Sequence, residues 1–498
     1  MPTQATDASA PGGIPCQSSN RVDDRAPRPK GATPRSTARH GLQENQDLRG
    51  SAVKTAAMLP PTLRGTHVLT GHLPQLRREA PAFLRTLPEF GDVVRIRIGL
   101  EPVYVVNSPD LARQVLVGDA RSYLKGAQFE IAARYFGHGL ATAPGGASHL
   151  AQRRMLQPAF HRSRMAGYAE VMSELAGREA RRWRHGDHVR VYERMYDLAL
   201  DVLGRTLFST SLGTYVIDDF RQCLPVLIKD VQHRVTTLMP LPGAIPTSRN
   251  RRTAAAMARL RAATAGIIAD YRASGTDRGD ILSSLLAARD EQTERGMTDQ
   301  QIHDEIVTLV VGGTETTAAT LSWAFHLLTT SPQVETELHA EVDAVALEGV
   351  VHYEHLPRMP VLASVVSETL RLYPTLLVIT RKTGSSTRLG AYVIPGNAQV
   401  WINMHALHHD PRTFPEPDLF DPRRWDHNTS GSRDGTYLPF GAGNRKCIGD
   451  DYALVEAALV LGTIASSWQL RHSTTRRIRT AAGTTVIPMN LPMEVRSR

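Results

Sequence analysis

Close to its carboxyl end the chain carries a single cysteine, Cys447, in a glycine-rich loop with the sequence FGAGNRKCIG. Glycine permits backbone turns and close contacts that other residues forbid, so something flat and bulky can approach the loop. Arg445 and Lys446 add positive charge beside a sulfur that must lose its proton to act as a ligand. The apolar segment 451–462 predicts a helix directly after the loop, and a helix N-terminus favours negative charge. The loop therefore predicts a thiolate held at the start of a helix.

The composition limits the class of protein that this chain can be. Its 498 residues are 41% hydrophobic, which supports a large buried core. The separations of its three cysteines, Cys16, Cys223 and Cys447, suit neither a disulfide framework nor a zinc site, which favours a reducing compartment. No apolar run reaches the roughly 18 residues that cross a bilayer, and no secretion signal is recognisable. We therefore expect a cytoplasmic protein with no membrane anchor.

Apolar periodicity divides the chain into a polar extension and one large domain. Residues 1–55 are rich in Pro, Gly, Ser, Thr, Arg and Asp, and they cannot bury enough surface to offset their ordering entropy. We predict a disordered extension there and a single domain over 56–498. Helical patterns dominate the domain, over 108–118, 148–157, 163–184, 190–210, 217–235, 251–274, 298–329, 331–346 and 359–372. Strand patterns cover 92–99 and 102–107, as a β-hairpin, and return near 377–401 and 484–496. The expected fold is mainly α with a small β part.

The longest helical pattern, 298–329, contains the string GGTETT from Gly312 to Thr317. Thr298 is a suitable N-cap for this helix. In a helix interior each glycine lowers the stability of the helix by about 1 kcal/mol relative to alanine, so another requirement must favour two adjacent glycines. One interpretation is close helix packing. The other is a local bulge or kink, helped by threonines that bond to carbonyl groups one turn back, which would open a groove for a small molecule.

The cysteine loop resembles the heme-thiolate signature of the cytochrome P450 family. That signature reads Phe, two residues, Gly, one residue, Arg, one residue, Cys, one residue, Gly, and it is matched by Phe440, Gly443, Arg445, Cys447 and Gly449. The resemblance covers residues 58–498. It implies a single large cytochrome P450 fold in which heme b lies between the long central helix and the cysteine loop, with its iron ligated by the Cys447 thiolate.

The GGTETT string is similar to the oxygen-activation motif of the same family. By that match Glu315 is the acid and Thr316 is the hydroxyl beside bound oxygen, and with ordered water they relay protons in an apolar pocket. The resemblance also implies further heme contacts: His149, Arg153, Arg381 and Arg445 for the propionates, and Phe440 and Gly441 in the loop. His149 stands where many relatives carry Trp.

A second set of charged residues resembles the scaffold of the family. Glu368 and Arg371 form an E-x-x-R pair on one helical face. In the family this is a buried ion pair completed by a downstream arginine, which Arg424 matches, and its expected role is to fix the geometry of the cysteine loop. Arg423 stands where the family commonly has Glu, and we expect a surface change there.

The spacing of His405, His408 and His409 is compatible with a metal site on a helix. Their segment, however, resembles the proline-rich stretch that precedes the cysteine loop in the family. There, histidines are structural or face solvent, and we favour that interpretation.

The resemblance implies a soluble bacterial heme monooxygenase, similar to actinobacterial enzymes of secondary metabolism. Such an enzyme inserts one oxygen atom of O2 into an unactivated C–H bond of a hydrophobic small molecule. A terpenoid is the first substrate candidate, before polyketides and fatty acyl compounds. Pocket residues are expected at 124–129, Leu309, Gly313, 376–379 and 491–493. They are mostly aliphatic, which favours a neutral, apolar substrate.

Electrons would come from a separate ferredoxin or flavodoxin and its NAD(P)H reductase, docked near Lys446. The net charge of +9 fits such docking and the heme carboxylates, and no run of Lys and Arg interleaved with aromatic residues indicates a nucleic-acid partner. We expect a monomer. Two alternatives remain open: a heme-thiolate isomerase or peroxygenase, against which Thr316 and Glu315 argue, and a non-catalytic heme-binding sensor or carrier.

Overall fold

The computed structural model describes residues 58–498, except residues 66, 238–242, 244, 291, 347, 427–434, 476–477 and 484. The disorder predicted for residues 1–55 lies outside the described residues. Backbone contacts group residues 56–498 into one compact unit. Within its described part this unit is mostly helical with a small strand part, which confirms the expected fold class.

Helices follow the sequence pattern closely. Their bounds are α1 (Leu73–Thr86), α2 (Pro109–Arg113), α3 (Ala127–Phe136), α4 (Gly146–Leu156), α5 (Arg162–Arg182), α6 (Val191–Leu207), α7 (Ser211–Thr236), α8 (Ser248–Ser274), α9 (Ile281–Ala287), α10 (Asp299–Thr330), α11 (Pro332–Val345), α12 (Pro360–Leu372), α13 (Met404–His408) and α14 (Asp450–Ala465). Helix α1 agrees with the amphipathic pattern of residues 60–87, which predicts an entry loop and a first helix, whereas α3, α9 and α13 lie outside the predicted helical ranges. Among the described residues, no helix is both long enough and apolar enough to span a membrane.

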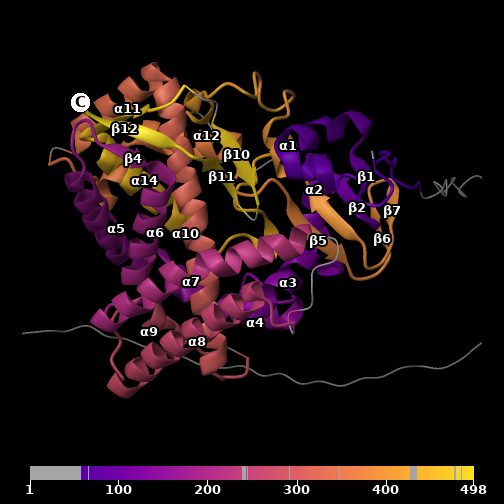
Figure 1. The fold of residues 1–498 in the computed structure, drawn as a ribbon, viewed down its shortest axis with the longest axis horizontal. Helices are drawn as coiled ribbons and strands as arrows, with labels where there is room; N and C mark the ends of the chain where they lie inside the picture. The colour runs from indigo at the N-terminus through magenta and orange to yellow at the C-terminus, as the bar shows by residue number, and fades with distance from the viewer. Residues whose placement is uncertain are drawn as a thin grey trace, which may run out of the picture. The chain divides into compact units, whose positions relative to one another are not determined.

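The strands form small sheets at the edge of the helical body (Figure 1). Their bounds are β1 (Val93–Ile98), β2 (Glu101–Val106), β3 (Tyr123–Lys125), β4 (His188–Arg190), β5 (Ile379–Thr383), β6 (Thr387–Leu389), β7 (Tyr392–Ile394), β8 (Gln399–Ile402), β9 (Trp468–His472), β10 (Arg479–Ala482), β11 (Val486–Met489) and β12 (Pro492–Ser497). One sheet has the order β1-β2-β8-β5-β3, and another has the order β4-β12-β9. Strands β10–β11 and β6–β7 form two-stranded ladders. The predicted hairpin is confirmed by the antiparallel pairing of β1 with β2.

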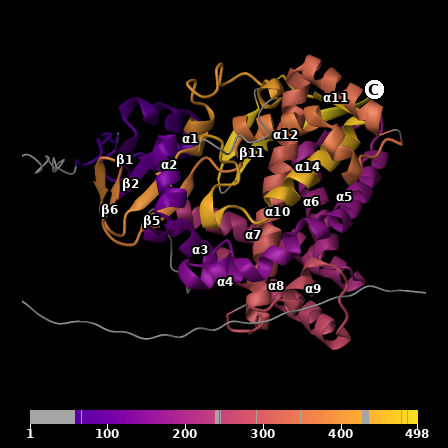
Figure 2. The same ribbon diagram turned by 180° about the vertical axis from the view of Figure 1, so that it is seen from behind.

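Helix α10 runs through the helical core, where it packs against α6 and α14 (Figures 1 and 2). It begins with a reciprocal capping box, in which the amide of Gln301 donates to the Thr298 hydroxyl and the amide of Thr298 donates to the Gln301 side chain. The predicted cap is therefore confirmed. All residues from Asp299 to Thr330 are helical, so the glycine pair does not interrupt the helix as a bulge would.

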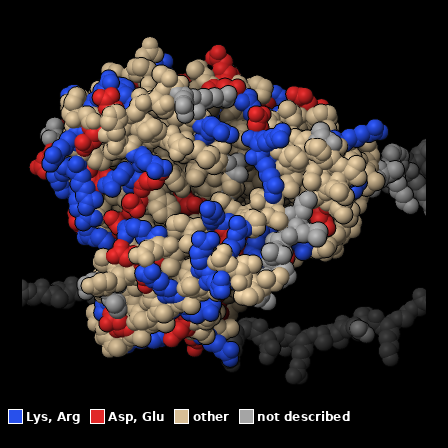
Figure 3. All heavy atoms as spheres, viewed as in Figure 1, with Lys and Arg blue, Asp and Glu red and all other residues tan. Residues whose placement is uncertain are grey.

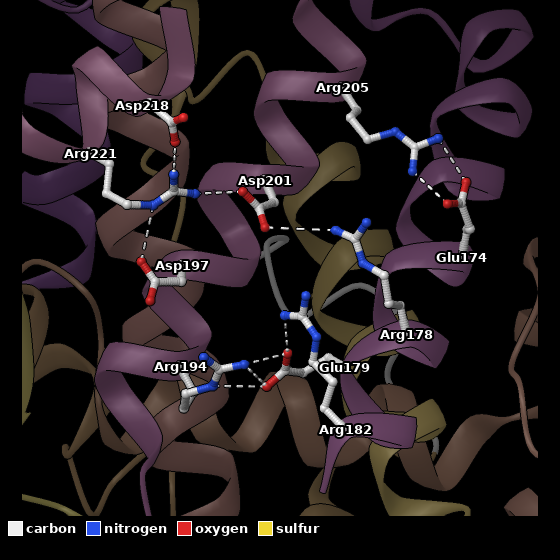
Figure 4. Close-up of polar contacts among 10 residues, drawn as sticks. All are labelled: Glu174, Arg178, Glu179, Arg182, Arg194, Asp197, Asp201, Arg205, Asp218 and Arg221. Carbon is white, nitrogen blue, oxygen red and sulfur yellow. Dashed lines mark hydrogen bonds and ion pairs between the residues drawn. The ribbon is translucent and has the colours of Figure 1, made fainter. Parts of the chain in front are cut away.

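Ion pairs fix the position of α6, which supports α10 (Figure 4). Arg221 of α7 reaches three carboxylates, including Asp201 of α6 at 2.5 Å and Asp197 at 3.4 Å. Arg194 of α6 binds Glu179 of α5 at 2.6 Å, and Glu179 is only 3% exposed. On the surface above these helices, Lys and Arg side chains are interleaved with Asp and Glu (Figure 3). The contacts therefore hold α5, α6 and α7 together, and α6 packs against α10.

Candidate functional site

The cysteine loop contains a 3-10 turn, η7 (Gly443–Arg445), and leads directly into helix α14. Its backbone folds back on itself, because the amide of Cys447 donates a 2.9 Å hydrogen bond to the carbonyl oxygen of Phe440. Gly443 has a φ of +72°, and a Cβ atom there would collide with the carbonyl oxygen of Leu116. The fold therefore requires glycine at this position of the signature.

The thiol of Cys447 is accessible, whereas Cys223, the other cysteine in the described part of the chain, is buried in α7. Cys447 has exposed surface, but protein atoms also surround its sulfur closely. Dense packing around it raises the pKa of the Cys447 thiol, although solvent can touch part of its surface. The amide of Gly449 and the charges of Arg153 and Lys446 act in the opposite direction. A coordinated metal ion deprotonates a thiol outright, and these groups would then stabilise the thiolate.

Buried basic side chains gather from separate elements near the cysteine loop. His149 of α4 is 3% exposed, Arg381 of β5 is 7% exposed and Lys125 of β3 is 8% exposed. Burial lowers the pKa of His149 to about 4, with Lys125 and Arg445 as the next causes. Burial also lowers the pKa of Lys125 to about 7 and that of Arg381 to about 10, and Arg445 contributes to both shifts. Each group is thus desolvated, and at pH 7 His149 is neutral, whereas Arg381 keeps its charge and repels Lys125 and Arg445.

The hydrogen bonds of this cluster go mainly to backbone carbonyl groups. Lys125 donates to the carbonyl oxygen of Ala141 at 2.7 Å, and Arg381 donates to that of Thr380 at 2.9 Å. Arg445 donates from Nη2 to the carbonyl oxygen of Tyr123 at 2.9 Å. Its buried Nη1 has no hydrogen-bond partner among the described residues. Carbonyl groups carry no net charge, so the repulsion within the cluster stays uncompensated.

The nearest buried acid is Glu305 of α10, which is fully buried and accepts a 2.8 Å hydrogen bond from the amide of Leu140. Burial raises the pKa of Glu305 to about 7, and the charge of Lys125 opposes this rise. One such acid cannot balance four neighbouring basic side chains. Buried cations are stable when anions pair with them, so the cluster fits a group that carries carboxylates, as the two propionates of heme do.

All four sequence-predicted propionate partners lie near one another: the charges of Arg445, Arg153 and Arg381 all lower the pKa of His149. Arg153 also contacts the cysteine loop, because its Nη1 donates to the carbonyl oxygen of Lys446 at 2.6 Å. The sequence analysis missed Lys125 as a member and placed it only in a pocket segment. The pairing of β3 with β5 brings it next to Arg381, and no local motif signals that pairing.

On α10, the hydroxyl of Thr316 donates a 2.7 Å hydrogen bond to the carbonyl oxygen of Gly312. This is the predicted bond to a carbonyl one turn back. A Cβ atom on Gly312 would have no heavy atom within 4 Å, so Gly312 borders open space. A Cβ atom on Gly313 would lie 2.7 Å from a methyl carbon of Leu203 on α6. The prediction that Gly313 faces the pocket is therefore wrong, because this glycine serves helix packing.

Glu315 accepts a 3.2 Å hydrogen bond from the hydroxyl of Thr485, in the turn between β10 and β11. It also lies near two tyrosines of α6, Tyr192 and Tyr196, whose pKa values are raised mainly by burial and then by the charge of Glu315. The β10–β11 turn thus contacts the distal motif. Residues 491–493 are the C-terminal segment that was expected to line the pocket.

The burial and the strand pairing of residues 491–493 contradict their predicted place in the pocket. Leu491 and Met493 are 1% and 0% exposed and belong to the main hydrophobic core. Met493 pairs with Val189 of β4 and with His472 of β9, so β12 is an interior strand of its sheet.

The predicted scaffold of charged residues is present. Arg371 and Glu368 of α12 are both fully buried and form a bidentate pair at 2.7 and 2.8 Å. Arg424 reaches Glu368 at 3.3 Å, and the indole of Trp425 donates to the same carboxylate at 3.0 Å. Arg371 also donates to the carbonyl oxygen of His408 at 2.8 Å. The cluster therefore links α12 to the segment that leads into the cysteine loop.

The histidines of this segment have structural contacts. His408 is fully buried, and its Nε2 accepts a 2.9 Å hydrogen bond from the amide of Leu438, just ahead of the cysteine loop. His409 contacts the carbonyl oxygen of His405 at 2.8 Å. Within the described ranges, no group of three or more His, Cys, Asp or Glu residues could hold a metal ion.

Known proteins resemble this chain over most of the domain. A family model described as Cytochrome P450 matches residues 60–491. Cyclooctatin synthase of Streptomyces melanosporofaciens is 41% identical over 82% of this chain and 90% of that protein. Cyclooctat-9-en-7-ol 5-monooxygenase of the same organism is 38% identical over 85% of this chain and 94% of that protein. Pentalenene oxygenase of Streptomyces avermitilis is 34% identical over 88% of this chain and 97% of that protein.

A solved structure shares the fold. The crystal structure of the heme domain of cytochrome P450DA has a TM-score of 0.80 and 26% identity, and it covers 89% of this chain and 98% of that chain. The comparisons confirm the predicted resemblance to actinobacterial enzymes of secondary metabolism, the monooxygenase class, and a heme cofactor with cysteine thiolate ligation. The chain belongs to the cytochrome P450 family.

Proposed function

We propose that this monooxygenase hydroxylates an unactivated C–H bond of a terpenoid, with electrons from a separate ferredoxin or flavodoxin and its reductase. The observation that supports the reaction most directly is the accessible thiol of Cys447 in a glycine-fixed loop, beside buried cations that lack matching anions. The names of the relatives support the substrate class, because cyclooctat-9-en-7-ol and pentalenene are terpenoid compounds.

In this proposal each part of the site has one task. Cys447 would ligate the heme iron, and the backbone of Phe440 and Gly441 would shape the loop that holds it. His149, Arg381, Arg445 and Lys125 hold the propionates, and Arg153 fixes the loop through Lys446. Bound heme supplies oxygen activation and the oxidation of the C–H bond, and the thiolate supports O–O cleavage by donating electron density.

The distal residues supply protons. The hydroxyl of Thr316 lies on the side of α10 that Gly312 leaves open, where it would supply a proton for the oxygen activation that bound heme provides. Glu315 stands one residue earlier and exchanges protons through Thr485 and ordered water. Their exchange with solvent restores the protons that each turnover consumes.

The substrate would lie above the porphyrin between α10 and the segment after α12. Leu309 and Leu377 are partly buried aliphatic residues there, and Leu376 is 38% exposed. These side chains bind through apolar contact and leave few groups for a charged substrate. A terpene hydrocarbon or alcohol has matching chemistry.

Electron transfer would take place on the cysteine side. Lys446 is exposed next to the loop and pairs with Asp450 at the start of α14, and an acidic partner would compete with Asp450 for its charge. An acidic ferredoxin or flavodoxin docked there would bring its cofactor close to Cys447, and the small charged contact would weaken with added salt.

The proposal is tested with heme-loaded protein, a ferredoxin, its reductase and NADPH. Reduced protein under carbon monoxide should absorb near about 450 nm because a thiolate lies opposite the gas. Terpene hydrocarbons and alcohols should shift the Soret band, and mass spectrometry should find a product heavier by one oxygen from labelled O2. Cys447→Ser should abolish the band. Turnover by this variant, or a panel of terpenoids without any labelled product, would refute the proposal.

A further inference from the structure

A small polar cleft lies between α5, α6 and α7 (Figure 4). Its volume is about 160 Å³, and every residue of its lining belongs to the described part of the chain. None of the residues proposed to contact heme, supply protons or bind the substrate lines it. Sites for organic small molecules have volumes of about 300–1,000 Å³, so this cleft suits a small ion.

Two arginines of the lining are already bound to its acids. Arg194 donates to both carboxylate oxygens of Glu179 at 2.6 Å. Arg221 reaches Asp201 at 2.5 Å and Asp197 at 3.4 Å. The three acids of the cleft therefore have close cationic partners in Arg194 and Arg221.

The other two arginines, Arg178 and Arg182, have only distant partners. They lie one turn apart on α5, and Figure 4 shows both guanidinium groups between Asp201 and Glu179. Arg178 is 3.8 Å from Asp201, and Arg182 is 3.5 Å from Glu179, whereas ordinary N–H···O hydrogen bonds measure about 2.7–3.2 Å. Their side chains are 46% and 55% exposed, so an ion from solution can reach them. Each guanidinium carries several N–H donors, and most of these donors are available to a ligand.

The charges of the lining favour an anion that carries a hydrogen atom of its own. Four arginines face three acids, so one positive charge is in excess. Arginine binds phosphate oxygens through parallel N–H···O bonds. Asp201, however, lies at the edge of the space beside Arg178, and an ionised carboxylate only accepts hydrogen bonds. Hydrogen phosphate can donate its P–OH group to this carboxylate, whereas sulfate has no hydrogen to donate and would be repelled.

We propose that this cleft binds a phosphate group in its hydrogen phosphate form, with Arg178 and Arg182 donating to the phosphate oxygens and Asp201 accepting from the P–OH group. The bound ion bridges α5 and α6, and α6 packs against α10. A ligand that binds only the folded protein stabilises it, so phosphate raises the stability of this chain. The proposal does not depend on the substrate of the monooxygenase.

The test is isothermal titration of the heme-loaded protein with inorganic phosphate, at pH 7 and constant ionic strength. Heme-loaded protein is used so that the basic side chains near the cysteine loop are not free to bind the anion. We expect one phosphate per chain, and binding of sulfate at least about tenfold weaker. Asp201→Asn keeps an oxygen for Arg221 but removes the negative charge, so this variant should bind both anions about equally. The midpoint of thermal unfolding of the wild type should rise with phosphate and not with sulfate.

Replacement of both Arg178 and Arg182 by Gln should weaken phosphate binding at least about tenfold, because charge-assisted hydrogen bonds are lost. Arg205→Gln is the matched control, since Arg205 of α6 pairs with Glu174 at 2.6 and 2.7 Å outside the cleft (Figure 4). This control should bind phosphate within about twofold of the wild type.

AMP is titrated in parallel to identify the source of the phosphate group. Binding as tight as that of inorganic phosphate assigns the site to phosphate esters, and clearly weaker binding assigns it to the free ion. No phosphate binding to the heme-loaded protein, equal binding of sulfate and phosphate by the wild type, or unchanged phosphate binding by the double Gln variant would overturn the inference.

Discussion

Lys125 and Arg381 are directly opposite each other in the antiparallel pairing of β3 with β5, and both are buried. Like charges that face each other across two strands destabilise a sheet. Here Arg445 adds to the same positive region, and the neutral ring of His149 lies beside it. An arrangement of like charges that destabilises the protein alone becomes favourable when a dianionic group binds, which agrees with the proposed contact of these side chains with the heme carboxylates.

The first prediction concerns Lys125→Met. Removal of one repelled cation relieves repulsion but also leaves the carbonyl oxygen of Ala141 without its donor, so the free energy of unfolding of the heme-free protein should change by no more than about 1 kcal/mol. The same change removes a charge-assisted contact to heme, so heme affinity should fall about tenfold. Urea denaturation of the heme-free protein and transfer of heme to apomyoglobin measure the two effects.

Lys382→Met is the control, because Lys382 follows Arg381 on β5, points to the opposite face and pairs with Glu130 at 3.3 Å. Its heme affinity should stay within about twofold of wild type, as expected for a surface ion pair. Equal heme loss in both lysine variants would show that Lys125 has no special role.

The second prediction compares two glycines of the cysteine loop. Gly443→Ala places a methyl group against the carbonyl oxygen of Leu116 at a positive φ, so the loop must shift and heme loading should fall at least tenfold. Gly449→Ala meets only the ring of Phe160 at 3.7 Å, an ordinary contact, at a φ of −101°. That variant should load heme normally. The ratio of Soret to protein absorbance after purification checks both, and similar loading by the two would contradict the steric argument.

Sequence patterns predicted the parts of this protein that depend on local order. The long helices, the β1–β2 hairpin and the cap at Thr298 follow from periodicity and from capping chemistry. The ion pair of Glu368 with Arg371 follows from their spacing on one helix. The resemblance added Arg424, which is distant in sequence and which the structure places beside Glu368.

The other features of the site depend on contacts between segments that are far apart in the sequence. Lys125 joins the cation cluster only because β3 pairs with a strand more than 250 residues away. Gly312 and Gly313 are equivalent in sequence, and the approach of Leu203 on α6 determines which of them borders open space. The turn at Thr485 reaches Glu315, whereas the predicted pocket segment 491–493 is buried, because β12 lies between two partner strands. None of these relations has a local sequence signal.

The third prediction concerns Glu456 of α14, which is fully buried next to the hydroxyl of Thr317 at 3.4 Å. Burial raises the pKa of Glu456 from 4.5 to about 8, so the folded state keeps a proton that the unfolded state loses. Stability from this group is present below pH 4.5 and falls as the pH rises toward about 8. The loss should be on the order of a few kcal/mol.

Glu456→Gln should remove this dependence, because the amide stays neutral at every pH. Urea denaturation from pH 5 to pH 9 compares the slopes of unfolding free energy, with Asp451→Asn, at an exposed position of the same helix, as the control. A wild-type slope equal to that of the Gln variant would show that Glu456 ionises normally in the folded protein.

The fourth prediction concerns the hydroxyl of Thr316. Thr316→Val keeps the shape of the side chain but removes the proton donor that now bonds to the Gly312 carbonyl. Substrate-induced Soret shifts should persist, while hydroxylated product per NADPH should fall about a hundredfold, as expected for a lost acid–base group. Thr320→Val is the matched control, since Thr320 makes the same kind of bond one turn later, to the carbonyl oxygen of Thr316 at 2.9 Å. Because the two variants lose equivalent helix contacts, only a proton-delivery role separates them. Equal product yields from both would therefore remove Thr316 from the reaction.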